Sequence, residues 1–156
     1  MDAALVWKPP RSAMSNNFSG LLDKLMDKHG IADLNADEFQ AFMDGHGDGV
    51  VLLCEEPDTA AESWDMAVIF PELLAAAGAG LRAAVMRPEP ARVVQTRFGI
   101  GRLPALLFLR DGAYVGVIEG LRDWSELVAE CAVMLKKPAS RAPSIGIAVT
   151  SSSGCH

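Results

Sequence analysis

The residues of this chain best suited to redox or nucleophilic chemistry are its three cysteines, Cys54, Cys131 and Cys155. No two of them are separated by two residues, so the sequence lacks the Cys-x-x-Cys pair on which dithiol–disulfide exchange depends. So small and odd a number of cysteines is typical of reduced cytoplasmic thiols rather than of a disulfide framework.

Four carboxylates follow the apolar run that ends at Cys54, and we call this segment the acidic loop. They are Glu55, Glu56, Asp58 and Glu62. Two interpretations stay open. Carboxylates at the start of a helix can simply stabilise that helix, by about 0.3–1 kcal/mol each when exposed. Alternatively, they form an anionic patch that receives arginines of a partner, because a carboxylate pairs with the guanidinium fork through two hydrogen bonds.

A second segment of interest precedes the strongly apolar residues 105–109. It reads Gly101-Arg102-Leu103-Pro104. A proline at the start of a strand donates no ladder hydrogen bond, and it is either an ordinary trans proline or a cis proline in a tight turn. In the second interpretation of the acidic loop, Pro104 lies beside the carboxylates and Arg102 borders them, where it could contact a carboxylate of the partner.

Metal-binding patterns are weak. Residues 44–49 followed by Glu55 nearly satisfy a calcium loop. However, His46 stands where a carboxylate or amide ligand belongs, and the apolar strand 50–54 follows instead of a loop and helix. The three histidines are His29, His46 and His156, and none of them stands at the spacing from a cysteine pair that is typical of a zinc site. We therefore predict neither a metal nor another cofactor.

Length, composition and charge limit the classes of protein that fit. The chain has 156 residues, of which 50% are hydrophobic, enough for the core of one domain. A net charge of −6 argues against sequence-independent nucleic-acid binding, which depends on many cations. The amino terminus lacks the features of a signal peptide, and the apolar stretch 66–81, interrupted by Pro71, is too short to span a bilayer comfortably. We expect a soluble, cytoplasmic protein.

Helical and strand patterns alternate along the middle of the chain. A helix is expected over 18–29, and Asn35 with Glu38 forms a capping-box-like start of a second one. Asp111-Gly112 is a strong hairpin signal. The other expected elements are strands 31–34, 50–54, 81–86, 105–109 and 114–119, and helices 63–77 with an interruption near Pro71, 90–99 and 123–137. This order predicts an α/β fold with a mixed sheet of four to five strands and helices on both faces.

The two ends of the chain differ in composition from the middle. Residues 8–20 hold two prolines, several serines and two asparagines, whereas the chain after Pro138 turns to Pro, Ser, Ala and Gly. We predict a flexible segment over 1–17, one domain over 18–137 and a disordered tail over 138–156.

Residues 31–135 resemble a thioredoxin fold. The segment 98–109 resembles the part that carries the cis-proline of thioredoxins, which implies that Pro104 is cis and lies where thioredoxins dock extended peptides. The loop 55–64 departs from the family because it contains no cysteine, and an ungapped comparison places Thr59 and Glu62 where the two thiols belong. We therefore reject oxidoreductase activity.

A narrower resemblance covers about two thirds of the chain. The segments 98–105, 112–117, Gly120 and 124–127, together with Gly49 to Leu53, are similar to the HupG/HyaE family. Its members are thioredoxin-like accessory proteins of nickel–iron hydrogenase maturation that lack the redox cysteines. The resemblance implies a chaperone that is not an enzyme, and that binds the hydrogenase small-subunit precursor at its twin-arginine signal peptide, alongside other maturation proteins. An acidic protein suits such a basic target.

Two other functions remain open at this point. One is a general peptide-binding module with a different client. The other is a single-cysteine thiol enzyme that uses Cys54 or Cys155, which requires an exposed thiol with a lowered pKa. The apolar surroundings of Cys54 argue against the second.

Overall fold

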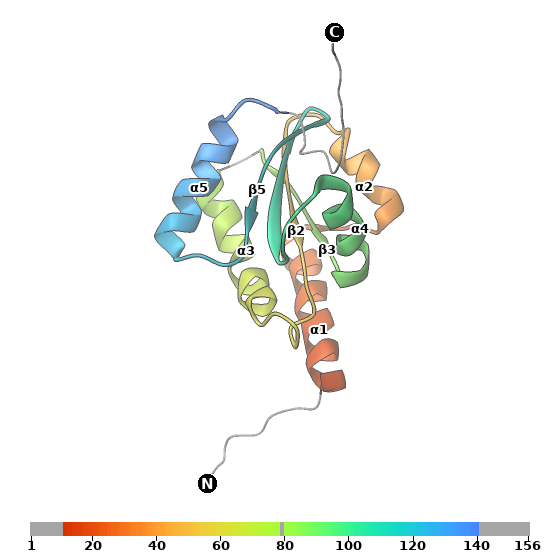
Figure 1. Cartoon of the computed structure of the whole chain (residues 1–156). Helices are drawn as coiled ribbons and strands as arrows, with labels where there is room; N and C mark the ends of the chain where they lie inside the picture. Colours follow the sequence, from red (N-terminus) through yellow and green to blue (C-terminus); the bar gives the residue numbers. More distant parts are fainter. Residues whose placement is uncertain (1–10, 79, 141–156) are drawn as a thin grey trace.

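A computed structural model of the chain describes residues 11–78 and 80–140, in which a mixed sheet separates two layers of helices (Figure 1). The strands lie in the order β1-β3-β2-β4-β5, with β1, β3 and β2 parallel to one another and β4 and β5 antiparallel to their neighbours. The elements are α1 (Arg11–His29), β1 (Ala32–Asp33), α2 (Ala36–Met43), β2 (Asp48–Leu53), α3 (Glu62–Ala77), β3 (Arg82–Met86), α4 (Pro88–Phe98), β4 (Ala105–Arg110), β5 (Ala113–Glu119) and α5 (Trp124–Lys136). The predicted α/β architecture is confirmed.

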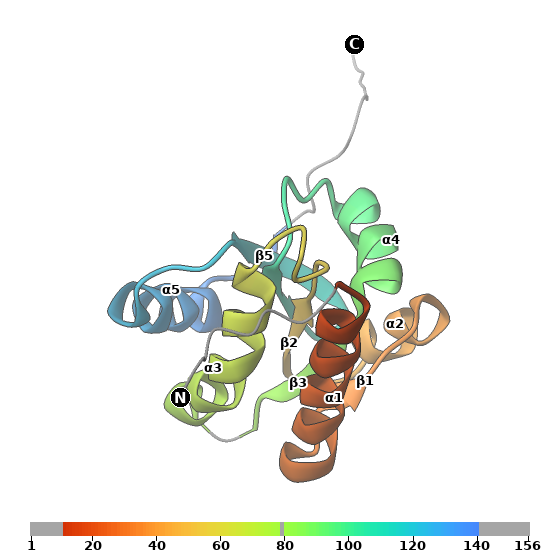
Figure 2. The same cartoon turned by 90° about the horizontal axis from the view of Figure 1, so that it is seen from below.

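The central strand β2 explains why the sheet needs helices on both faces. Its apolar residues alternate between the two sides, and none from Val50 to Leu53 is more than 2% exposed. Val50 and Leu52 pack into the core under α1, α3 and α5, whereas Val51 and Leu53 pack into the core under α2 and α4. Figure 2 shows α1 beside α3, so the first face carries three helices and the second carries two.

Local signals in the sequence correctly mark several turns and helix ends. The capping box of Asn35 and Glu38 is present at the start of α2. Gly99 ends α4 in the left-handed conformation, with φ of 65°. The β4–β5 turn has positive φ at both Asp111 and Gly112, as a two-residue hairpin requires. The Leu103–Pro104 peptide bond is cis, as the resemblance to thioredoxins implied.

One expected helix boundary and one expected interruption of a helix are wrong. Helix α1 begins at Arg11 rather than at residue 18, so residues 11–17 are not a loose segment. Serine and asparagine are only mildly unfavourable in a helix, and the turns that pack Phe18 and Leu22 into the core supply the nucleus from which these residues continue. Helix α3 runs through Pro71 without a break, because Phe70 and Leu73 hold the flanking turns against the sheet.

The expected disordered tail also starts too early. Ser140 returns to β5, where its N–H donates to the carbonyl of Tyr114 (2.7 Å) and its hydroxyl to that of Val115 (3.1 Å). Residues 1–10 and 141–156, and with them the expectations for Cys155 and His156, lie outside the described residues. Among the helices that the structure describes, none has the length and apolar character needed to cross a bilayer.

The glycine-rich turn before β2, which partly resembled a calcium loop, is built around an arginine. Arg82, at the start of β3, donates to the carbonyls of Phe42 (2.6 Å), Gly45 (3.3 Å) and Gly47 (3.2 Å). A Cβ at Gly45 would lie 2.8 Å from Cζ of Arg82. The small residues here therefore make room for the guanidinium.

Candidate functional site

The acidic loop and the segment before Pro104 meet at one end of the sheet, where β2 ends, α3 begins and β4 starts. They line an open groove with a volume of about 490 Å³, which we call the cis-proline groove. Its lining residues are Glu55, Thr59, Ala60, Glu62, Gln95, Gly101, Arg102 and Leu103. Of the residues predicted for the site, Glu55, Glu62 and Arg102 are thus brought together beside Pro104.

Glu62 and Arg102 form an ion pair in the cis-proline groove. Nη2 of Arg102 donates to Oε1 of Glu62 at 3.0 Å, and both side chains remain well exposed, at 57% for Arg102 and 40% for Glu62. The guanidinium lies against Gly120, where an added Cβ would be 2.8 Å from Cζ of Arg102. The predicted partner contact of Arg102 is therefore occupied, in this structure, by a carboxylate of the same chain.

Glu55 forms the second ion pair of the groove, and it is held more firmly. Its Oε1 accepts from Nη2 of Arg92 at 2.6 Å and from the N–H of Glu56 at 2.9 Å, and its side chain is only 17% exposed. The N–H of Glu55 donates to Oγ of Ser63 at 2.9 Å, which ties the acidic loop to the first turn of α3. These contacts indicate that Glu55 fixes the shape of the loop.

The main chain before Pro104 is only partly paired. The N–H of Gly101 donates to Oε2 of Glu119 at 2.9 Å, and the carbonyl of Pro104 accepts from the N–H of Gly120 at 2.8 Å. Between them, the main-chain N–H and C=O groups of Arg102 and Leu103 make no hydrogen bond to any residue that the structure describes. Such a free donor and acceptor at the edge of a groove can pair with the main chain of an extended peptide.

Glu56 and Asp58 do not line the cis-proline groove. Glu56 belongs instead to a second groove of about 450 Å³ at the carboxyl ends of β1 and β3. Its other lining residues are Asp33, Leu34, Asn35, Glu38, Arg87, Pro88, Glu89 and Pro90. Asp58 is exposed in the loop between the two grooves. The acidic loop thus faces two grooves rather than forming one continuous patch around Pro104.

Arg87 closes the inner side of this second groove. It donates to Ser19 (2.8 Å) and Asp23 (2.7 Å) on α1, and to Asp33 (3.4 Å) at the end of β1. Burial opposes the charge of this guanidinium, but the hydrogen bond and charge of Asp23, together with the charge of Asp33, outweigh it and raise its pKa. The residue therefore remains cationic and joins α1 to the sheet.

Of the two described cysteines, the one nearer to the cis-proline groove is poorly suited to act as a nucleophile. Cys54 follows β2 and is fully buried. Burial raises the pKa of its thiol far above the ordinary value, and the nearby charge of Arg87 lowers it only in part. Cys131, on α5, is also buried, and burial likewise raises its pKa. These observations disfavour the thiol-enzyme alternative at Cys54.

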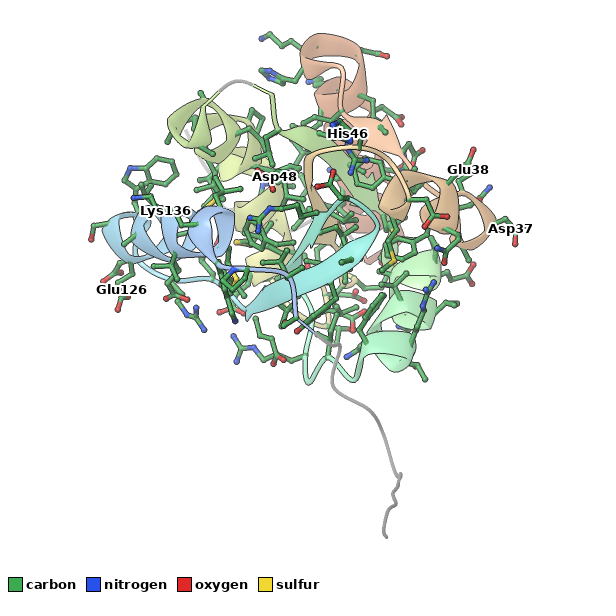
Figure 3. The ribbon with its side chains drawn as sticks, turned by 90° about the horizontal axis from the view of Figure 1, so that it is seen from above. Asp37, Glu38, His46, Asp48, Glu126 and Lys136 are labelled. Carbon is green, nitrogen blue, oxygen red and sulfur yellow. The ribbon has the colours of Figure 1, made fainter. Side chains whose placement is uncertain are left out.

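Metal ligands do not gather in the described part of the chain, where no group of three or more His, Cys, Asp or Glu side chains could hold an ion. Figure 3 shows His46 and Asp48 near the turn before β2, well apart from Asp37 and Glu38 on α2. His46 pairs with Asp111 across the turn at 3.2 Å. The carboxylates and histidines are thus spread over separate elements.

Sequence reasoning missed Arg92, Gln95 and Glu119, which complete the cis-proline groove and its supports. Arg92 is 37 residues from its partner Glu55, and Glu119 is 18 residues from Gly101. The residues next to them in the sequence give no sign of these contacts. The contacts exist only because the fold brings α4 and β5 to the same end of the sheet.

Comparison with known proteins connects these features to a family. The model of the family described as hydrogenase-1 expression protein HyaE matches residues 21–127. The chain is also 40% identical to the hydrogenase expression/formation protein HoxO of Cupriavidus necator, over 87% of this chain and 88% of HoxO. The chain belongs to the HupG/HyaE family. The hydrogenase expression/formation protein HupG of Bradyrhizobium diazoefficiens is 34% identical, over 80% of this chain and 86% of that protein.

Solved structures show the fold of this HupG/HyaE family member. Thioredoxin f from spinach chloroplast superposes with a TM-score of 0.56 at 16% identity, and the match covers 67% of this chain and 92% of thioredoxin f. A chain from a structural study of yeast mitochondrial 1-Cys peroxiredoxin gives a TM-score of 0.53, covering 65% of this chain and 96% of that one. The protein is a hydrogenase expression/formation protein with a thioredoxin-like fold.

Proposed function

We propose that this HupG/HyaE protein is a redox-inactive chaperone of nickel–iron hydrogenase maturation. It binds the precursor of the hydrogenase small subunit through the twin-arginine signal peptide, in the cytoplasm, and works alongside other maturation proteins. It catalyses no reaction. The peptide lies extended in the cis-proline groove.

The cis-proline groove is the observation that carries this proposal. The groove is lined by Thr59 and Glu62, which an ungapped comparison places where thioredoxins have two thiols, and beside them lies the unpaired main chain of Leu103. The carboxylate of Glu62 can pair with a cation, and the main chain of Leu103 can pair with the main chain of an extended peptide. An arginine-bearing peptide supplies both.

The proposal is tested by recovery of the precursor from cells that express the hydrogenase. The tagged wild-type protein should enrich the small-subunit precursor, and a Glu62→Gln variant should recover less of it. Known assembly partners are followed in the same samples as a positive control. Absence of the precursor, while those partners are recovered, would overturn the proposal.

A synthetic signal peptide separates this function from that of a peptide-binding module with another client. The wild-type protein should bind the twin-arginine peptide more tightly than a scrambled peptide of the same composition. Equal binding of the two would show that the protein recognises charge alone and would favour the general module.

A further inference from the structure

We propose that Glu62 is the carboxylate that receives an arginine of the bound peptide, and that Arg102 occupies it as a built-in competitor while the groove is empty. Binding then exchanges one guanidinium for another. This inference rests on the proposed function, because it specifies how the cis-proline groove selects its peptide.

Glu62 is better placed for exchange than Glu55. One oxygen of Glu62 accepts one hydrogen bond from Arg102, and both side chains are about half exposed. Glu55 accepts two hydrogen bonds and is largely buried, so displacing Arg92 would also disturb the loop. An exposed ion pair of the Glu62 kind contributes little stability, and an incoming guanidinium that uses both carboxylate oxygens can replace it.

The position of Arg102 lets it compete with an arginine of the peptide for Glu62. Its side chain crosses from the segment before Pro104 to the first turn of α3, beside the unpaired main chain of Leu103. An extended peptide that pairs with Leu103 therefore meets the Arg102–Glu62 pair. Because Arg102 is 57% exposed, its guanidinium can swing into water without unpacking the core.

This arrangement predicts a preference for arginine over lysine in the peptide. The ammonium group of lysine is a compact point charge without a planar fork, so it does not form the paired, parallel hydrogen bonds to both carboxylate oxygens that arginine forms. Arginine gains a second hydrogen bond, because its planar fork matches the two oxygens of Glu62. Arg102 thus lowers the affinity of the groove for every ligand that must displace it from Glu62. The loss of affinity is largest for ligands without a guanidinium.

The test uses the full-length protein and three synthetic peptides that differ only in a central pair, Arg-Arg, Lys-Lys or Gln-Gln. Binding is measured by calorimetry for the wild type, Arg102→Gln and a matched control, Arg122→Gln. Arg122 does not line the groove: it pairs with Glu130 and donates to the main-chain carbonyl of Glu119 at 3.4 Å. Each variant removes one positive charge, so the two change the net charge equally. Arg102→Gln should bind the Arg-Arg peptide about twofold to fivefold more tightly than Arg122→Gln, the range that one exposed ion pair supplies.

Each outcome either supports or overturns the inference. Tighter binding of the Arg-Arg peptide by Arg102→Gln, lost again in the double variant with Glu62→Gln, supports the exchange. Equal or weaker binding by Arg102→Gln overturns it while the proposed function stands, and so does an equal gain for all three peptides. If neither the wild type nor either variant binds the Arg-Arg peptide, the proposed function fails and the inference fails with it. Thermal melting of each variant shows that it is folded.

Discussion

Single residues decide what this thioredoxin-like end of the sheet can offer to a ligand. Glu62 gives the groove a carboxylate that pairs with a guanidinium, whereas the nearby thiol of Cys54 is buried in the core. A buried thiol with a raised pKa stays protonated near neutral pH, which disfavours its attack on a disulfide. What the groove offers to a ligand is therefore charge and main-chain hydrogen bonding.

The reactivity of Cys54 can be measured directly. In a Cys155→Ser variant, the remaining thiols are both buried, so alkylation near neutral pH should be slow in the folded protein and fast in denaturant. The denatured sample is the control for reagent quality. Equal labelling rates in the two samples would contradict the burial of Cys54.

The same burial predicts a pH dependence of stability. The folded pKa of Cys54 lies above the unfolded value, which is about 8.5 for a free thiol. Its stabilising contribution is therefore complete below that pH and is lost as the pH rises beyond it. Urea unfolding between pH 7 and 10 should show a steeper fall for the wild type than for Cys54→Ala. Parallel curves would refute the assignment.

Gly120 should tolerate no side chain. Its φ of 79° favours glycine, and a Cβ would also press on the guanidinium of Arg102. Gly47 has a similar φ of 84° with open space around it, so Gly47→Ala measures the backbone strain alone. We expect both variants to lower the free energy of unfolding, measured in urea, by about 1–2 kcal/mol. Only Gly120→Ala should alter the binding of the Arg-Arg peptide. Unchanged binding would show that Arg102 does not need this surface.

At the scale of elements, arginines hold helix ends and turns that have no local cap. Arg110, on β4, reaches the last turn of α5, where it donates to the carbonyls of Met134, Leu135 and Lys137. The carbonyls of Met134 and Leu135 are among those that a helix leaves without partners at its carboxyl end, and Lys137 is the residue that follows the helix. Its Nε also donates to Asp48 on β2, so one side chain connects three elements.

Removing this connection should destabilise α5 in particular. We expect Arg110→Gln to lower the free energy of unfolding by about 1.5–3 kcal/mol, the range for hydrogen bonds made by a charged group. Lys136→Gln, an exposed charge change on the same helix, serves as the control. Hydrogen exchange should quicken at the end of α5 in Arg110→Gln. Exchange that stays as slow as in the control would contradict the role of Arg110.

The elements also show which parts of the fold can be predicted from the sequence. The start of α2 and the β4–β5 turn were predicted because their signals lie within four consecutive residues, as in the box of Asn35 and Glu38. The start of α1 and the continuity of α3 were not, because packing against the sheet outweighs weak local propensities. The groove pairs Glu62–Arg102 and Glu55–Arg92 join residues 40 and 37 positions apart, so only the fold reveals them.

Across the whole molecule, α1 is a third helix on one face, and Arg87 fastens it there. Three residues of α1 contact this guanidinium, namely Ser19, Asp23 and Met26. We expect Arg87→Gln to lower the free energy of unfolding by about 1.5–3 kcal/mol, because the carboxylates that pair with Arg87 lose their charged partner. Hydrogen exchange should increase throughout α1, with Arg97→Gln, an arginine of α4 without a contact to α1, as the control. Protection of α1 equal to that of the control would show that its apolar face alone secures it.

The two margins of the sheet have a consequence for how copies of the protein behave in concentrated solution. At one margin β1 is only two residues long, and at the other β5 has an irregular register and carries Ser140 on two of its carbonyls. Short, irregular or covered margins offer no long template on which a neighbouring chain could extend the ladder. We therefore expect the protein to resist edge-to-edge association through either margin of its sheet, even in concentrated solution.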